Sequence, residues 1–327
     1  MIKKLLKRFL VGAIILALLG AAFFMYAEHK YNEVYIINVP QEVLIERGTG
    51  LNRMANILVA HQVVKNPYWF IFFARLNGLE GSLKAGEYGF AEEVSYASVL
   101  SKLVKGDVIV RSVTIPEGKT LFEIKQIVMA NPYLTGEITN SYKEGEILPE
   151  TYHFTRGEQR EAILKKARQA MKNELLKAFD ERENNLPFKS AEEMLVLASI
   201  VEKETGLVSE RAKVASVFIN RLRLGMKLQT DPTVIYAVTK GEMNLDRPIY
   251  KRDLAYDSPY NTYLYEGLPP GPICSPGKAA IQAVAHPDKT PYLYFVADGM
   301  TGGHRFAKSL SEHNANVALY RTFKGKI

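Results

Sequence analysis

The chain has 327 residues, of which 47% are hydrophobic and 24% are charged, and its formal net charge is +7. This composition excludes a disordered tail and is sufficient for two domains of ordinary size. Four basic residues, Lys3, Lys4, Lys7 and Arg8, stand together near the start, and without them 38 Lys and Arg face 35 Asp and Glu. The remaining excess is small, which argues against nucleic acid as a partner.

The first 27 residues predict a membrane anchor. A basic flank over residues 1–8 precedes an uncharged run over residues 9–27, which as a helix would extend about 28 Å, close to the thickness of the hydrocarbon core. The positive-inside rule places the flank in the cytoplasm and everything after Glu28 outside. A cleaved signal peptide is the alternative, with a small-residue site at 20–22, but the apolar run continues beyond it to Tyr26.

Cysteine and histidine usage argues against a metal or nucleotide site. Cys274 is the only cysteine, which excludes an intrachain disulfide and a zinc site with several cysteines, and we expect it to be a small buried side chain. The six histidines show no metal-ligand spacing, and no glycine-rich phosphate loop follows a strand. We therefore expect no metal and no cofactor.

Residues 28–150 predict a small α+β module and a connector, because short strand-like and helix-like patterns alternate there. We expect strands over 34–39, 84–90 and 107–115, and helices over 48–60, 67–77, 95–104 and 121–130. Asn66 before Pro67, and Thr120 with Glu123, are N-terminal capping signatures. Gly and Pro accumulate at 145–157, which predicts a boundary with a second domain over residues 151–327.

The sequence of the second domain predicts several helices and a hairpin near the C-terminus. A long amphipathic helix over 158–183 is expected to be a solvated support, and a helix over 209–224 to pack in the core. Asp231-Pro232 and Ser275-Pro276 predict helix starts by a capping residue followed by proline, for helices over 232–239 and 277–285. Strands over 291–297 and 304–307 predict a hairpin before a last helix capped by Ser309 and Glu312. We expect His304, on this hairpin, to have a structural role.

The most informative segment is an apolar helix over 190–206 that ends in carboxylates. Ser190 and Glu193 have the spacing of a capping box, and Gly206 supplies the stop. Glu202 and Glu204 fall in the last turn, where burial and the helix dipole both raise the pKa of a carboxyl. Because positions two apart differ by about 200° in direction, only one of them can face a given cleft. We expect one to be a proton donor and the other to be solvated or salt-bridged. The alternative is that both are ordinary polar residues at a helix end.

A long loop over 256–273 is dense in Tyr, Pro and Gly. Tyrosine rings stack on the apolar faces of sugars, and Asn and Thr side chains bond to hydroxyl groups. A loop of this length predicts a sugar groove, and the alternative is a rigid cover over the core that is pinned by proline.

Several motifs resemble the YceG-like family of endolytic peptidoglycan transglycosylases. The resemblance covers the whole chain after the anchor and is densest from about 194 to 313. The segments that carry it are 197–205, 213–222, 228–236, 260–263, 267–271 and 292–298, with the sequences LASIVEKET, KVASVFINRL, LQTDPTVIY, YNTY, GLPPG and YLYFVAD. Two further segments, 48–57 and 118–127, resemble the opening of LysM carbohydrate-binding modules, although Gly, Thr and Leu start many helices.

The resemblance implies the architecture and location of the protein. It implies a LysM-like module within 28–150 and a mixed α/β catalytic domain over 151–327 with a helix-borne glutamate, so the overall class is α+β. It also implies a bacterial envelope enzyme that is held by a single pass in the inner (plasma) membrane, with the catalytic domain extracytoplasmic. Peptidoglycan glycan strands are the implied substrate, and association with penicillin-binding synthases is suggested.

The resemblance also assigns the site. The essential glutamate of the family is the second one of its Glu-Lys-Glu-Thr motif, which falls on Glu204. We infer substrate contacts from side-chain type at five other motif positions, Gln229, Asp231, Tyr260, Asn261 and Tyr263.

The expected reaction is lytic transglycosylation of the bond between N-acetylmuramic acid and N-acetylglucosamine, which leaves 1,6-anhydro ends and terminates or releases nascent strands. Glu204 is expected to be the sole general acid and base. Two alternatives stay open: a muramidase that consumes water, and a noncatalytic scaffold that holds glycan while the anchor recruits synthases.

Overall fold

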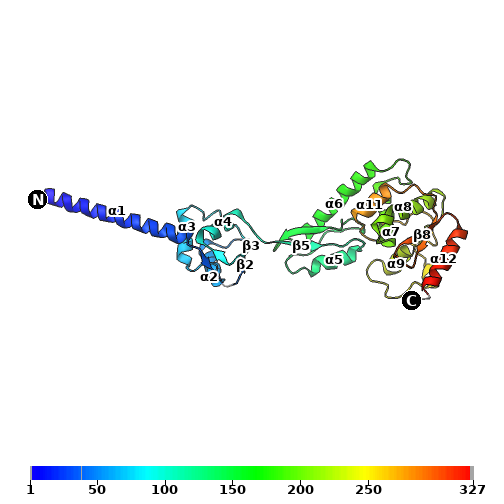
Figure 1. The fold of residues 1–327 in the computed structure, drawn as a ribbon, viewed down its shortest axis with the longest axis horizontal. Helices are drawn as coiled ribbons and strands as arrows, with labels where there is room; N and C mark the ends of the chain where they lie inside the picture. Colours follow the sequence, from blue (N-terminus) through cyan, green and yellow to red (C-terminus); the bar gives the residue numbers. More distant parts are fainter. Residues whose placement is uncertain (1, 38, 325–327) are drawn as a thin grey trace. The chain divides into compact units, whose positions relative to one another are not determined.

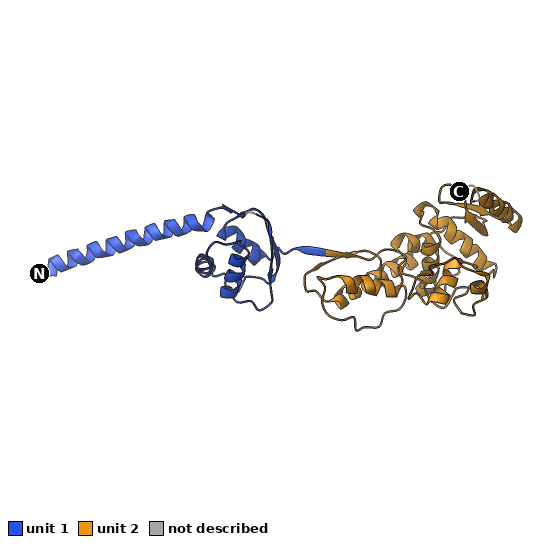
Figure 2. Cartoon of the chain, turned by 90° about the horizontal axis from the view of Figure 1, so that it is seen from below, with its two compact units in different colours: residues 1–111 blue, residues 112–327 orange. Residues whose placement is uncertain are grey.

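The structure is a computed structural model that describes residues 2–37 and 39–324. The chain forms two compact units, residues 1–111 and residues 112–327 (Figure 2). The mixed α+β class predicted from the sequence is confirmed by the elements of both units. The predicted boundary at residues 150 and 151 falls inside the second unit, because apolar side chains on both sides of it share one core: Val113, Ile124, Phe154 and Ile163 belong to the same buried cluster.

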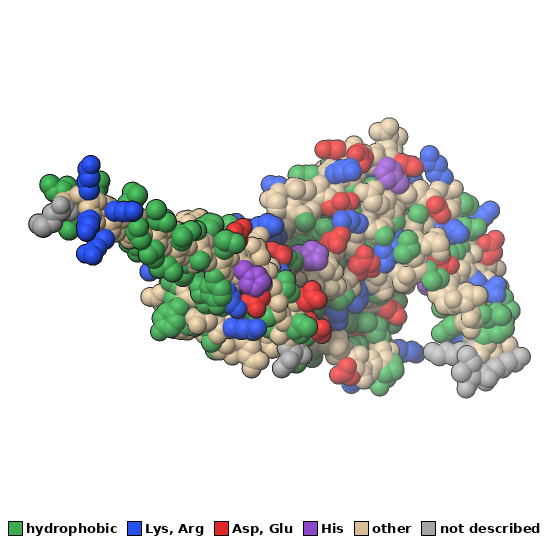
Figure 3. Space-filling model, turned by 60° about the vertical axis from the view of Figure 1, so that its left-hand side comes forward, with side chains coloured by type: hydrophobic (Ala, Val, Ile, Leu, Met, Phe, Trp, Pro, Cys, Tyr) green, Lys and Arg blue, Asp and Glu red, His purple; other side chains and the backbone are tan. Residues whose placement is uncertain are grey.

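The first unit begins with helix α1 (Ile2–Asn32), which contains the predicted anchor (Figure 1). Among the described residues it is the one helix that is long and apolar enough to cross a membrane. Its apolar side chains are exposed along most of its length, and Figure 3 shows the basic side chains gathered at its N-terminal end. Only Ala27 is buried, where the end of the helix joins the core of the unit.

The rest of the first unit is built from two short antiparallel strand pairs and three helices. Strand β1 (Tyr35–Ile36) pairs with β4 (Glu93–Val94), and β2 (Gln41–Ile45) pairs with β3 (Gly86–Phe90). The predicted strand over 34–39 is therefore shorter than expected, and β2 was not predicted. In β2 the side chains of Val43 and Ile45 are buried and those of Glu42 and Leu44 are exposed, as expected for a strand with one face on the core.

Of the three helices that follow α1, α3 and α4 begin within one residue of their expected starts, and α2 begins three residues after the expected Gly48. Helices α2 (Leu51–Ala60), α3 (Pro67–Leu76) and α4 (Tyr96–Lys105) follow Gly50, Asn66 and Ser95. The Asn66 side chain accepts a hydrogen bond from the backbone of Tyr68, which satisfies one of the free N–H groups at the start of α3.

The second unit opens with strand β5 (Val110–Thr114), which crosses the division between the units and pairs with β6 (Thr151–Thr155). Helix α5 (Leu121–Ala130) has the predicted capping box of Thr120 and Glu123, with both hydrogen bonds formed. The long helix α6 (Arg160–Glu181) follows β6. These elements enclose a core of their own around Ile147 and Ile163.

Helix α7 (Ala191–Glu204) lies at the centre of the second unit and carries the candidate glutamate at its end (Figure 1). Nine of its residues are buried, which agrees with the all-round apolar sequence. It packs against α8 (Val208–Arg223) and α11 (Lys278–Ala285). Helices α9 (Asp231–Thr239) and α10 (Lys251–Leu254), strands β7 (Tyr294–Ala297) and β8 (His304–Ala307), and helix α12 (Leu310–Lys324) complete the unit.

Two predicted caps are wrong. Thr230, not Asp231, occupies the N-cap of α9, and Asp231 is the first helical residue. Gly277, not Ser275, occupies the N-cap of α11. Pro232 lies in the first turn of α9, which its fixed φ suits, whereas Pro276 precedes the N-cap of α11. The chain enters α9 one position before, and α11 two positions after, the expected residue.

Candidate active site

The side chain of Glu204 lines a cavity of about 460 Å³. Contributions come from the end of α7, from α8, from the turn before α9, from the Tyr-rich loop, and from β7 and α12. The lining residues are Glu204, Phe218, Arg221, Leu228, Gln229, Asp231, Tyr263, Tyr294, Phe295, Val296, Leu310, His313 and Val317. Several segments that are far apart in the sequence therefore surround one carboxyl group.

A cluster of threonines holds the carboxyl of Glu204. The hydroxyl of Thr230 donates a hydrogen bond to Glu204 Oε1. Thr230 is itself buried, and its backbone N–H donates to Thr262 Oγ1 at 3.1 Å. Thr233 Oγ1 donates to the backbone carbonyl of Thr230 at 2.7 Å. The start of α9 and the Tyr-rich loop thus fix the donor that faces Glu204.

Burial raises the pKa of Glu204 above its ordinary value of 4.5. The hydrogen bond from Thr230 favours the charged form and opposes this, whereas the negative charge of Asp231 adds to it. His304 and Arg221 contribute a smaller lowering. The net result is a carboxyl group that keeps its proton to higher pH than an exposed glutamate does.

Three of the five predicted contact residues join Glu204 in the cavity: Gln229, Asp231 and Tyr263. The phenol of Tyr263 donates to Asp231 Oδ1 at 2.6 Å. Gln229 has φ 48°, in the left-handed region, and its backbone N–H donates to the carbonyl of Thr262. This turn directs the segment 228–231 along one wall of the cavity.

The other two predicted contact residues, Tyr260 and Asn261, do not line the cavity, and the structure gives them partners inside the protein. Asn261 is fully buried, and its Nδ2 donates to the carbonyls of Leu254 and Tyr256 at 3.0 and 2.8 Å. Its Oδ1 accepts from the backbone N–H of Tyr263 at 3.0 Å. The ring of Tyr260 packs against that of Tyr236, with centroids 4.8 Å apart.

Three polar side chains of the cavity were not predicted: Arg221, Tyr294 and His313. Arg221 donates from Nε to the carbonyl of Leu293 at 2.6 Å and from Nη1 to that of Leu228 at 2.7 Å. Its guanidinium lies over the ring of Tyr294, 5.2 Å from the centroid, and His313 stacks on the same ring. Arg221 and Tyr294 stand in the motifs quoted above, so their position there was the available signal. His313 stands outside the quoted motifs.

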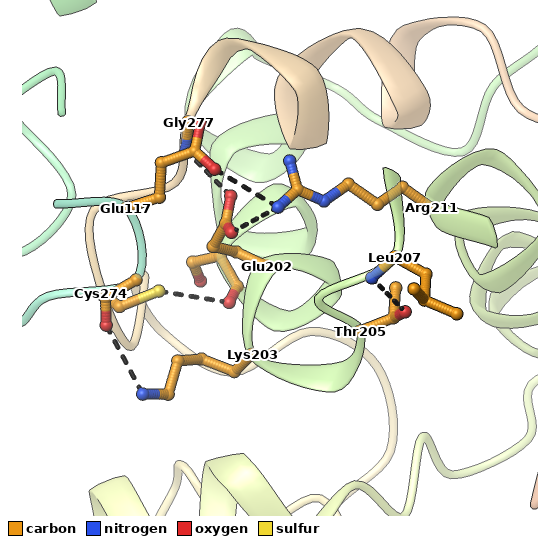
Figure 4. A network of polar contacts seen from close by, with 10 residues as sticks. Glu117, Glu202, Lys203, Thr205, Leu207, Arg211, Cys274 and Gly277 are labelled. Atoms are coloured by element: carbon orange, nitrogen blue, oxygen red, sulfur yellow. Dashed lines mark hydrogen bonds and ion pairs between the residues drawn. The ribbon is translucent and has the colours of Figure 1, made fainter. Parts of the chain in front are cut away.

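Glu202 points away from this cavity and is held in an ion-pair network (Figure 4). It accepts from Arg211 Nη2 at 2.9 Å and from the backbone N–H of Gly277 at 2.9 Å. Arg211 Nη2 also bonds to Glu117 at 3.2 Å. The side chains of Glu202 and Arg211 are each only 5% exposed. These contacts agree with the expectation that only one of the two glutamates faces a given cleft and that the other is salt-bridged, and the role of Glu204 as proton donor stays a prediction.

His304 has a structural partner, as expected. Its Nδ1 shares a hydrogen bond with Glu210 Oε2 at 2.7 Å, and its backbone N–H donates to Glu210 Oε1. Within the described part of the chain no group of three or more His, Cys, Asp or Glu residues is arranged to hold a metal ion. The cysteine, Cys274, is buried and unpaired with any other cysteine.

A larger cavity, of about 810 Å³, lies on the opposite face of α8, beside the segments 182–186 and 287–291. It contains none of the predicted site residues. We therefore place the candidate site at the smaller cavity, where a carboxyl with a raised pKa and several polar side chains converge.

Comparison with known proteins identifies related chains. The profile of the YceG-like family matches residues 43–319. A protein from Bacillus subtilis (strain 168) named endolytic murein transglycosylase is 32% identical over 323 residues, which cover 89% of this chain and 86% of that protein. A protein of the same name from Streptococcus pneumoniae serotype 2 (strain D39 / NCTC 7466) is 27% identical over 368 residues, which cover 95% of this chain and 65% of the pneumococcal protein.

A crystal structure of a yceG-like protein from Listeria monocytogenes superposes with a TM-score of 0.54 at 31% sequence identity, covering 84% of this chain and 98% of that one. The family profile spans both units of the chain and includes every residue of the Glu204 cavity. The chain therefore belongs to the YceG-like family.

Proposed function

We propose that this protein is an endolytic murein transglycosylase that cleaves peptidoglycan glycan strands internally. The observation that carries the proposal is the Glu204 carboxyl, whose pKa is raised by burial and which lines a cavity with Tyr263 and Asp231. A carboxyl group that keeps its proton to higher pH than an ordinary glutamate is suited to act as a general acid. The names of the relatives from Bacillus subtilis and Streptococcus pneumoniae support the same class of reaction.

In the proposed reaction Glu204 acts twice. It first gives its proton to the glycosidic oxygen between N-acetylmuramic acid and N-acetylglucosamine, and the bond from C1 to that oxygen breaks. The C6 hydroxyl of the same muramoyl ring then attacks C1, and the Glu204 carboxylate takes the hydroxyl proton. The product is a 1,6-anhydro end, and no water is consumed. Because the nucleophile belongs to the substrate, its effective concentration at C1 is high.

The surroundings of Glu204 favour this reaction over a retaining hydrolase. A retaining hydrolase needs a second carboxylate about 5 Å from the first to act as nucleophile. Asp231 is the other carboxylate that lines the cavity, and its Oδ1 accepts the hydrogen bond from Tyr263. We assign Asp231 to positioning Tyr263 and to raising the pKa of Glu204, not to attack on the sugar.

We assign substrate contacts to Gln229, Asp231 and Tyr263, which line the cavity with Glu204. Tyr260 and Asn261 support the loop from within, so their contribution to binding is indirect. No cofactor takes part. Helix α1 anchors the chain in the inner (plasma) membrane with the N-terminus in the cytoplasm, and the catalytic unit acts outside it. Penicillin-binding synthases are the proposed partners, and strand termination or release is the proposed role.

Digestion of purified glycan strands by a Glu204→Gln variant tests the proposal. The variant is expected to give no 1,6-anhydro product while its fold and its binding of strands persist. Glu192→Gln is the matched control, because it changes an exposed glutamate in the first turn of the same helix and should cleave normally. Undiminished anhydro product from Glu204→Gln would exclude Glu204 as the acid.

The same digestion separates the two alternatives. A muramidase leaves reducing ends, which are heavier by one water than anhydro ends and are therefore distinguished by mass spectrometry. A noncatalytic scaffold binds strands without any product from the unmodified protein. Either result would replace the transglycosylase assignment.

A further inference from the structure

Helix α3 of the first unit is apolar on every side, although only one side of it is covered by protein. Its sequence, PYWFIFFARL, has one charged residue, Arg75, which pairs with Glu80. Phe70, Phe73 and Ala74 are buried in the core of the unit. A helix that is hydrophobic all round is normally buried on all sides, in a core or in a membrane.

The opposite side of α3 presents large apolar side chains to the exterior. Tyr68, Phe72 and Leu76 are spaced four residues apart and so lie on one face of the helix. Tyr68 is 78% exposed and Leu76 is 56% exposed, while Phe72 is half-buried. Trp69 borders this face and is half-buried as well. Contiguous exposed apolar side chains of this size mark an interaction surface.

The contacts between α1 and α3 show beside which residues of the anchor this face lies. The ring centroid of Trp69 lies 6.3 Å from that of Phe23 and 6.0 Å from that of Tyr26. Phe72 also contacts Phe23, with ring centroids 5.9 Å apart. Phe23 and Tyr26 belong to the apolar run that ends at Ala27, with Phe23 about 6 Å inside that end.

A helix packed beside Phe23 and Tyr26 must contact the bilayer in which α1 is inserted. The outer end of the apolar run marks the boundary between hydrocarbon and headgroups, the region in which Trp and Tyr are enriched. The end of α1 is fixed to the unit, since Ala27 is buried and Tyr31 packs on Phe73 at 5.0 Å. The exposed face of α3 is therefore continuous with the apolar surface of the anchor.

We propose that α3 is a second membrane element, which lies in the outer headgroup region beside α1 with Tyr68, Trp69, Phe72 and Leu76 in contact with lipid. The first unit is thereby held against the membrane surface and does not swing freely on its anchor. This inference concerns the first unit alone and does not depend on the reaction at Glu204.

Trp69 is the only tryptophan of the chain, so its fluorescence reports on this face without any labelling. The full-length protein is reconstituted in vesicles of phosphatidylcholine and phosphatidylglycerol whose acyl chains carry bromine either near the headgroup or near the terminal methyl. We expect bromine near the headgroup to quench Trp69 more strongly than deep bromine, and dissolved acrylamide to quench it weakly.

Two variants make the result decisive. Leu16→Trp combined with Trp69→Phe reports on the middle of α1 and should be quenched most by deep bromine, which verifies that the anchor spans the bilayer. Tyr68→Glu combined with Leu76→Glu places charges on the exposed face without touching the core, and should weaken bromine quenching of Trp69 and increase quenching by acrylamide. Circular dichroism establishes that this variant keeps its fold.

Strong acrylamide quenching of Trp69, with no effect of brominated lipid, would overturn the proposal if the Leu16→Trp reporter still responds to deep bromine. Protection from acrylamide without quenching by either lipid would also overturn it, because a second copy of the chain or a glycan strand would then cover the face.

Discussion

Glu202 and Glu204 lie two positions apart at the end of α7 and have entirely different surroundings. Glu202 is enclosed between Arg211 and the backbone of Gly277, whereas Glu204 lines the cavity beside Thr230. The opposite directions follow from the helical rotation of about 200° over two residues. The pair on the Glu202 side ties α7 to α8 and to the start of α11, which fixes the turn that carries Glu204.

We expect Glu202→Gln to destabilise the second unit by about 3 kcal/mol, because it removes the buried partner of Arg211 and leaves the buried guanidinium only the exposed carboxylate of Glu117. Burial raises the pKa of Glu202 despite the bonds from Gly277 and Arg211, and two buried nitrogens of Arg211, Nε and Nη1, have no hydrogen-bond partner among the described residues. The hydrogen-bonding capacity of the pair is thus incompletely used. A double Glu202→Met, Arg211→Met variant should therefore recover most of the stability that Glu202→Gln loses.

Chemical denaturation of Glu202→Gln and of its control Glu192→Gln measures the first difference. The single variants Glu202→Met and Arg211→Met, measured with the double variant, complete a double-mutant cycle. If the double variant loses as much stability as the two single changes added together, the two side chains are energetically independent and the network does not fix the end of α7.

Thr230→Val is expected to slow strand cleavage about tenfold, because the hydroxyl stabilises the Glu204 carboxylate that forms when the proton leaves, and a hydrogen bond to a charged group contributes about 1.5 kcal/mol. Loss of this bond also raises the pKa of Glu204 further, since the bond favours the ionised form. The alkaline limb of the pH–rate profile should therefore move to higher pH.

Thr230→Ser keeps the hydroxyl and serves as the control, with a rate and a profile close to those of the unmodified protein. A Thr230→Val profile that coincides with the native one would mean that this hydroxyl does not act on the catalytic carboxyl.

Much of the fold could be predicted because its signals are local. The caps Asn66 and Thr120 and the apolar pattern of α7 are properties of short segments, and the structure has them where expected. Strand β2 was missed because it is defined by its pairing with β3, about forty residues further along the chain. The compact units divide between Arg111 and Ser112, and local Gly and Pro content does not reveal that residues on both sides of position 150 share a core.

The centre of the candidate site was predictable, and its surroundings were predictable only in part, since Gln229, Asp231 and Tyr263 line the cavity but Tyr260 and Asn261 do not. The acidic end of a buried helix marks Glu202 and Glu204 together, and the choice of Glu204 comes from the resemblance to the family motif. Thr230, Arg221 and Tyr294 meet Glu204 only through tertiary packing, and Arg221 lies on a helix whose sequence indicates packing alone. Asn261 has a side chain that can bond to sugar hydroxyls, but its depth in the loop is set by carbonyls that no sequence pattern marks.

Mutation of Asn261 and of Tyr263 should affect different properties, namely stability in the first case and substrate binding in the second. Asn261→Ala removes the donor to two carbonyls and the acceptor of the Tyr263 N–H, all buried or half-buried, and should cost about 3 kcal/mol of stability. Tyr263→Phe removes only the hydroxyl that bonds to Asp231, so it should leave the melting temperature nearly unchanged and raise the KM for glycan strands.

Thermal unfolding and strand-cleavage kinetics on both variants check this pair. Asn261→Ala with an unchanged melting temperature and a raised KM would restore Asn261 to the role of a direct substrate contact.

Glu144 makes stability depend on pH through a group outside the active site. It accepts the backbone N–H of Leu121, at the start of α5, at 2.8 Å, and its burial raises its pKa from 4.5 to about 7. Between these two values the unfolded chain has lost the proton and the folded chain still binds it, so stability falls as pH rises through this window. A pKa shift of this size corresponds to a change of about 3 kcal/mol in the free energy of unfolding.

Glu144→Gln keeps an oxygen for the Leu121 N–H and cannot ionise. Below pH 4.5 the variant and the native protein should have the same free energy of unfolding. As the pH rises the variant should become more stable relative to the native protein, by up to about 3 kcal/mol above pH 7. Denaturation at a series of pH values measures the difference, with the exposed Glu137→Gln as control. Parallel stability curves for Glu144→Gln and the native protein would show that this carboxyl ionises equally in the folded and unfolded chains.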